Sequence, residues 1–250
     1  MRNFGLLVAA AGAAVLLIQP AAATTWGKSN VRDPVSGKTI EVQEPMSSGS
    51  YIYSWPGKED QVFWPMTDDH WLWFNPKSGY GAFGGDFAKL EGEALDRVKT
   101  WLAAHYDKRQ PPASRLELLA WLEQIYGQRG MDEDFWCFFY RLMAFEYSQK
   151  DPAKSLEYVK KALPMIERLL ANPESDDARI TFLYLLGEYN RRLGNLDASR
   201  SYFDQAKSAT YKNREGQTLV GSPYFVKLIE EREAIGKAEP TGTPETPPGQ

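Results

Sequence analysis

The spacing of apolar residues in the larger, C-terminal part of the chain constrains its fold most strongly. Leu90, Leu95, Val98 and Leu102 recur every three to five residues, which is the pattern of one face of an amphipathic helix. Similar stripes continue to the end of residues 88–235, separated by the glycines and prolines that end helices. We therefore predict a mainly α fold built from consecutive antiparallel helices.

Start and stop signals set the expected bounds of these helices. Asp151-Pro152 is an N-cap residue followed by proline at the first helical position, and Asn172-Pro173 repeats this signal for a fifth helix that ends at Gly194. Pro164 lies within the fourth helix, so we expect a kink or a break there. The other expected helices cover residues 88–110, 116–127, 132–148, 196–209 and 223–235.

Residues 24–87 differ in composition from the helical part, because they are rich in glycine, proline, serine and aromatic residues. Short apolar runs bounded by turn residues are typical of strands. The expected strands are Thr39–Val42, Tyr51–Tyr53, Gln61–Trp64 and His70–Phe74. We predict a small, aromatic-rich β unit that packs against the helices, because it is too thin to fold alone.

The two ends of the chain are not expected to join this core. Residues 1–23 resemble a secretory signal peptide, with a positive residue, the uncharged apolar run Phe4–Ile18 and small residues up to a cleavage site after Ala23. That run is shorter than the roughly 20 residues that span a bilayer, so we expect cleavage and a periplasmic or secreted protein. Residues 236–250 contain four prolines and three glycines, and we expect a disordered tail.

Charge and composition exclude several classes of function. The chain has 29 basic and 33 acidic residues, and removal of the signal peptide changes its net charge from −4 to −5. Without a basic block it has little to offer a phosphate backbone, so nucleic-acid binding is excluded. No later segment is long and apolar enough to cross a membrane. Cys137 is the single cysteine, which precludes an intramolecular disulfide, and its apolar neighbours favour a buried hydrophobe over a reactive thiol.

Catalytic motifs are missing from the sequence. The two histidines, His70 and His105, form no His-Glu-x-x-His pair, and no nucleophile elbow, phosphate-binding loop or dinucleotide fingerprint occurs. The carboxylate pairs Asp132/Asp134 and Asp176/Asp177 lie in first turns of expected helices, where acids stabilise the helix dipole. We predict a protein that is not an enzyme and needs no cofactor.

Residues 181–206 resemble a tetratricopeptide repeat. Leu186-Gly187 stands where that repeat carries its Leu-Gly pair, and Gly194 lies at the turn between the two helices. We expect Gly187 to let the helices approach closely around Phe203, and Gly194 to supply a left-handed C-cap. The small, aromatic and small positions of the second helix are Ser199, Phe203 and Ala206.

A weaker copy of this unit lies upstream. Its equivalent positions are Leu142, Ser155, Val159 and Ala162. Ala162 and Ala206 are 44 residues apart, against roughly 34 in the standard repeat. The expected fold is therefore tetratricopeptide-like.

A longer motif is similar to a bacterial family, the domain of unknown function 2225 family. The segment Tyr184–Asn195 reads Tyr-Leu-Leu-Gly-Glu-Tyr-Asn-Arg-Arg-Leu-Gly-Asn and resembles the family's helical signature, and Gly79–Phe83 with Asp86-Phe87 resembles the segment after its second zinc knuckle. The resemblance covers about residues 30–210. It implies a zinc-ribbon-like start followed by a helical repeat.

The expected knuckles keep their proline and glycine but contain no cysteine. The family's ligand positions are occupied by Asp33, Ser36, Asn75 and Ser78. One carboxylate, two hydroxyls and an amide do not hold Zn²⁺ tightly, and a single carboxylate is too little charge for Ca²⁺. We predict a degenerate zinc ribbon without metal.

Two surfaces are candidates for partner binding. In stacked helix pairs, the first helix of the best repeat would present Tyr184, Glu188, Arg191 and Arg192 to another protein or peptide. The alternative is that these residues form an intramolecular network.

The second candidate is an aromatic platform of Trp55, Trp64, Trp71 and Trp73. It would stack on cell-wall or surface glycans, and burial of these rings in the core is the alternative. The function expected first is a non-catalytic interaction or scaffold module of a bacterial cell envelope, and the second is a glycan-binding protein.

Overall fold

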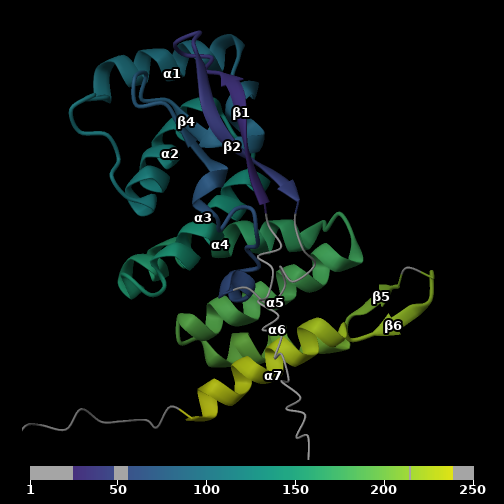
Figure 1. Ribbon diagram of the computed structural model, residues 1–250. Coiled ribbons are helices and arrows are strands. Elements are labelled where there is room, and N and C mark those ends of the chain that lie inside the picture. Colours follow the sequence, from purple (N-terminus) through teal and green to yellow (C-terminus); the bar gives the residue numbers. More distant parts are fainter. Residues whose placement is uncertain (1–24, 48–55, 214, 239–250) are drawn as a thin grey trace, which may run out of the picture.

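The computed structural model describes residues 25–47, 56–213 and 215–238, and it is mainly helical (Figure 1). This confirms the mainly α prediction at the level of fold class. The α-helices are α1 (Gly92–His105), α2 (Arg115–Arg129), α3 (Glu133–Tyr147), α4 (Pro152–Ala171), α5 (Asp176–Arg192), α6 (Leu196–Ser208) and α7 (Pro223–Ala238).

The described strands form three separate two-stranded antiparallel sheets. They pair β1 (Thr25–Arg32) with β2 (Thr39–Ser47), β3 (Leu72–Phe74) with β4 (Gly81–Phe83), and β5 (Thr210–Lys212) with β6 (Thr218–Val220). Between the first and second sheets lie the short 3₁₀ helices η2 (Pro56–Asp60) and η3 (Asp69–Trp71), and η4 (Gly84–Lys89) connects β4 to α1.

The helices stack in chain order, and the N-terminal strands lie against the α1–α2 end of the stack (Figure 1). Close packing joins α3 to α4, α4 to α5 and α5 to α6, and α7 packs on both α5 and α6. One hydrophobic cluster contains Val42, Tyr80 and Phe83 from the N-terminal unit together with residues of all seven helices named above. The N-terminal unit and the helices therefore share a core.

Two glycines control the junction of α5 and α6. A Cβ atom on Gly187 would lie 2.3 Å from a ring carbon of Phe203, so only glycine allows the two helices to approach this closely. Gly194 has φ +81°, and the next amide donates to the carbonyl of Asn190 at 2.8 Å, which closes α5 with a left-handed C-cap. Both expectations for these glycines are confirmed.

Some predicted bounds are wrong. α4 runs without a break through Pro164, because proline removes only one helical hydrogen bond and packing on α3 and α5 holds the rest. Asn172 is the C-cap of α4, and α5 begins three residues later than expected, after its N-cap Ser175. α7 continues to Ala238, so the first residues assigned to the tail are helical.

The expected strand Gln61–Trp64 is also wrong. Gln61 has φ +51°, in the left-handed region, and the segment forms turns after η2 instead of pairing with a strand. The predicted signal peptide, the predicted strand Tyr51–Tyr53, Trp55 and residues 239–250 lie outside the described residues. In the part of the chain that is described, no helix is long and apolar enough to cross a membrane.

Candidate functional site

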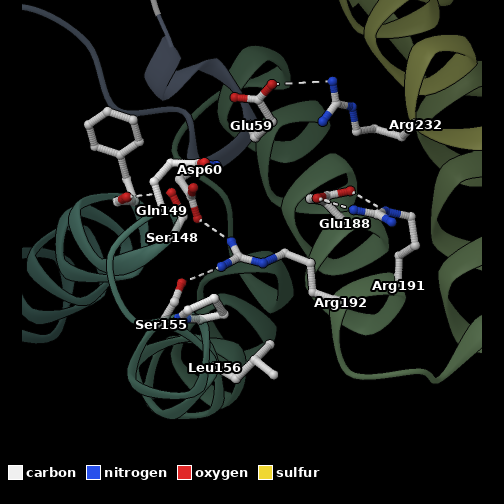
Figure 2. Close-up of a pocket in the computed structure, with 12 residues that line it drawn as sticks. Glu59, Asp60, Ser148, Gln149, Ser155, Leu156, Glu188, Arg191, Arg192 and Arg232 are labelled. Carbon is white, nitrogen blue, oxygen red and sulfur yellow. Dashed lines mark hydrogen bonds and ion pairs between the residues drawn. The ribbon is translucent and has the colours of Figure 1, made fainter. Parts of the chain in front are cut away.

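A cleft of about 580 Å³ opens between the C-terminal part of α5, the turn that joins α3 to α4, η2 and the middle of α7 (Figure 2). We call it the arginine cleft. Its apolar side consists of Phe145, Pro152 and Leu156, and Ser148, Gln149 and Ser155 lie at their edge. Its charged side consists of the arginines Arg191, Arg192 and Arg232 and the carboxylates Glu59, Asp60 and Glu188.

The Asp60 carboxylate anchors the floor of the arginine cleft. Arg192 Nη1 and the Tyr189 hydroxyl both donate to Asp60 Oδ1 at 2.8 Å. The other end of the Arg192 guanidinium donates to Ser155 Oγ at 2.6 Å, and Ser155 donates to the carbonyl of Ala144. Arg192 thus bridges η2 and α4, as Figure 2 shows. Burial raises the pKa of Asp60, while Arg192 and Tyr189 favour its charged form.

The segment Lys58–Gln61, which we call the acidic turn, lies across three helices. From α3, Arg141 donates to the backbone carbonyls of Asp60 and Gln61 at 3.1 and 2.8 Å. From α7, Arg232 pairs with Glu59 at 3.2 Å. On the same helix, Glu231 pairs with Lys58 at 3.1 Å, and the Tyr224 hydroxyl accepts from the Gln61 amide at 3.2 Å. Together with Asp60 on α5, these contacts attach the turn to α3, α5 and α7.

The structure separates the four predicted partner-binding residues. Tyr184 is fully buried and packs on Phe203 and Phe225, so its assignment to an exposed face is wrong. Glu188 lines the arginine cleft, but its side chain is only 2% exposed and accepts two hydrogen bonds from Arg191, at 2.8 and 2.9 Å. Arg191 and Arg192 line the cleft.

Sequence reasoning missed three charged residues of the cleft, namely Glu59, Asp60 and Arg232. No local motif contains them, and Asp60 is 132 residues away in sequence from its partner Arg192. A possible signal was the polar sequence Lys-Glu-Asp-Gln of the acidic turn, which lies in an otherwise aromatic region.

The four positions that the family resemblance predicts as ligand sites converge on one carboxylate. Asp33 is fully buried, and its Oδ2 accepts hydrogen bonds from the Ser36 hydroxyl at 2.6 Å, the Asn75 amide at 2.5 Å and the Ser78 hydroxyl at 2.7 Å. Its Oδ1 accepts from the backbone amide of Val35 at 2.8 Å. We call these four side chains the Asp33 cluster.

The two turns that carry the Asp33 cluster have the same backbone geometry. Asp33 N–H donates to the carbonyl of Lys38, and Gly37 N–H donates back to the carbonyl of Asp33. In the second turn, Asn75 N–H donates to the carbonyl of Tyr80, and Gly79 N–H donates to the carbonyl of Asn75. Gly37 and Gly79 have φ of +72° and +78°, which favours glycine at both sites.

The Asp33 cluster does not fit a zinc ion. Its hydroxyl and amide groups donate hydrogen bonds to the carboxylate, so the one anionic group of the cluster is already engaged by three side-chain donors and the Val35 amide. In the described residues, no three side chains of His, Cys, Asp or Glu gather as metal ligands.

The proposed tryptophan platform is not assembled as expected. Trp73 is buried, and its indole N–H donates to the carbonyls of Gln43 and His70 at 3.0 and 3.1 Å. Trp71 packs beside Trp73 at 6.3 Å between ring centroids, and Trp64 is half-buried near Trp26. The assignment of Trp73 to a stacking surface is wrong, because its ring belongs to the core.

The remaining reactive side chains are held apart from the arginine cleft. Cys137 is buried, and burial raises the pKa of its thiol, which disfavours the nucleophilic thiolate. The His70 ring hydrogen-bonds to Asp68 at 2.8 Å, and His105 stacks on Trp101 with 4.8 Å between ring centroids. The two histidines are in different parts of the fold.

Comparison with protein-family models, with curated proteins and with solved structures found no match for this chain. The resemblance to the domain of unknown function 2225 family stays a prediction from the motifs.

Changing Asp33 tests whether the Asp33 cluster holds the N-terminal unit. We expect Asp33→Asn to lower the free energy of unfolding by about 2–4 kcal/mol, because the amide places a donor against other donors and removes the charge. Asp107→Asn is the matched control: Asp107 makes the same hydrogen bond to a backbone amide two residues ahead, but its side chain otherwise pairs only with exposed Arg109. Urea denaturation measures both, and equal losses would contradict a special role for Asp33.

Removing Arg192 tests the anchor of the acidic turn. We expect Arg192→Met to lower the free energy of unfolding by about 3–5 kcal/mol at pH 7, because Asp60 is left buried without its cation. Burial raises the folded-state pKa of Asp60 above its ordinary 3.8, and losing Arg192 raises it further. Protonated Asp60 can stay buried without a cation. The loss of unfolding free energy should therefore be smaller at pH 4 and grow as the pH rises towards 7. Adding Asp60→Asn to the variant should remove this pH dependence. Urea denaturation at each pH would show a constant deficit if Asp60 were not responsible.

Proposed function

We propose that this chain is a non-catalytic interaction module of a bacterial cell envelope that holds a peptide segment of a partner protein in the arginine cleft. The observation that carries the proposal is the fixed position of the cleft's guanidinium groups. Arg191 and Arg192 are held from behind by the buried carboxylates of Glu188 and Asp60, which are 2% and 3% exposed. Groups fixed in advance lose little conformational entropy when a ligand binds.

The apolar lining of the cleft supports a peptide ligand. Phe145, Pro152 and Leu156 supply apolar surface in the same cleft as the arginines. Specific binding sites commonly combine apolar walls with a few fixed polar groups, and arginine is enriched among residues that dominate protein interfaces. A peptide satisfies both sides with alternating apolar and polar side chains.

The helices around the cleft are consistent with the tetratricopeptide-like arrangement that we propose for α3–α6. α3 packs closely with α4, and α5 packs closely with α6. Gly187 and Phe203 meet in the second of these pairs, as in that repeat. In such an arrangement α3 and α5 line one surface. The burial of Trp73 weakens the glycan-binding alternative, because this ring is not available for stacking on a sugar.

Selection from a random peptide library tests binding in the arginine cleft. We expect the full chain to enrich peptides whose labelled copies bind it in fluorescence anisotropy. Leu156→Ser should weaken binding about tenfold, since roughly 1.4 kcal/mol of lost apolar contact gives that factor. Lys160→Ser, at an exposed position on the same helix, is the control. Failure to enrich any peptide, or binding that ignores Leu156, would refute the proposal.

We also propose that the chain is exported, which rests on residues 1–23 alone. The expected mature protein begins at Thr24. Intact mass and N-terminal sequencing of the protein from a bacterial envelope fraction measure this directly. A retained Met1 would contradict cleavage.

A further inference from the structure

The acidic turn contacts the helices through two carboxylates that differ in burial and in their number of partners. Asp60 is 3% exposed and has two side-chain donors, Arg192 and Tyr189. Glu59 is 27% exposed and has one ion pair, with Arg232 at 3.2 Å. Asp60 is therefore a fixed part of the fold. Glu59 pairs with Arg232 at the rim of the cleft, where its carboxylate is partly exposed and a carboxylate of a ligand can replace it (Figure 2).

Arg232 has more hydrogen-bonding capacity than Glu59 uses. Within the described residues, neither the buried Nε of Arg232 nor the buried hydroxyl of Tyr184 has a hydrogen-bond partner. Burial raises the pKa of Tyr184 well above its ordinary value, and the charge of Glu188 raises it further, while that of Arg232 lowers it. Buried donors normally have acceptors. Arg232 lines the arginine cleft, whereas Tyr184 is fully buried behind it, so the unused donor capacity next to the cleft is that of Arg232.

The surroundings of Arg232 favour an anionic acceptor. Arg232 and Arg191 line both the arginine cleft and a neighbouring pocket of about 290 Å³ that also contains Arg200 and Glu233. The chain itself places a carboxylate, that of Glu59, on Arg232. Arginine binds carboxylates through charge-assisted hydrogen bonds, which are about twice as strong as neutral ones.

We propose that the partner peptide is acidic, that it places a carboxylate side chain on Arg232, and that Glu59 is a tethered stand-in which this carboxylate displaces. The proposal rests on the peptide-binding function above and names the chemistry of its ligand. A tethered group competes at a high effective concentration, on the order of millimolar. The chain thereby keeps Arg232 paired when no partner is bound and excludes weak anions from it.

The test uses the full chain and two labelled, C-terminally amidated peptides. The acidic probe is Gly-Leu-Glu-Leu-Glu-Gly, with leucine for the apolar wall and glutamate for Arg232, and its neutral twin carries glutamine in place of glutamate. Fluorescence anisotropy measures both dissociation constants. We expect the acidic probe to bind at least about tenfold more tightly than the neutral twin, which corresponds to one charge-assisted contact.

Glu59→Gln is the decisive variant. We expect it to tighten binding of the acidic probe about five- to tenfold, because the competitor for Arg232 is removed and the binding-competent fraction rises. Glu231→Gln removes the neighbouring ion pair of the same turn with α7, through Lys58, and should leave binding unchanged. Arg232→Gln should erase the preference for the acidic probe, with circular dichroism reporting whether the variant is folded. A purely structural Glu59 would give no gain in affinity.

The outcomes separate this inference from the function on which it rests. Equal binding of the two probes, or no tightening by Glu59→Gln, overturns the acidic ligand and the stand-in role. If library peptides still bind in a Leu156-dependent way, the peptide-binding function stands without it. If no peptide of any kind binds, both proposals fall.

Discussion

The buried contact between Asp60 and Arg192 is the interaction on which the arrangement of this protein depends. Removing a carboxylate from water costs several kcal/mol, and only a cation with further hydrogen bonds compensates for that cost. Arg192 and Tyr189 of α5 supply these bonds, while Ser155 of α4 fixes the other end of the guanidinium. One carboxylate thereby sets how the N-terminal unit meets two helices, and it also fixes the floor of the arginine cleft.

Local patterns predicted what local forces determine. The helices and the cap at Gly194 follow from periodicity and backbone sterics within a few residues. The close approach at Gly187 joins two helices that are consecutive in the chain. Gln61–Trp64 has the apolar run of a strand, but the distant Arg141 takes the carbonyls of Asp60 and Gln61. That competition could not be predicted, because its partners lie about 80 residues away.

The candidate site was predicted only in part for the same reason. Arg191 and Arg192 belong to a recognisable motif, and they line the cleft. Tyr184 belongs to the same motif, yet its position on the helix turns it into the core between α5, α6 and α7. Spacing along a helix gives the relative direction of side chains, but the neighbouring elements decide which direction is covered. Here α7 covers Tyr184 and also contributes Arg232.

The Asp33 cluster has a consequence for how the chain reaches its native state. Two turns of equal geometry are joined by one carboxylate, two hydroxyls and an amide, all encoded in the chain. Two turns that are linked by a metal ion must first bind that ion, and their thiolate ligands can be oxidised. A joint of oxygen and amide groups needs no loading step. It forms as soon as the two turns meet, and its strength is independent of metal supply and of the redox state of the compartment.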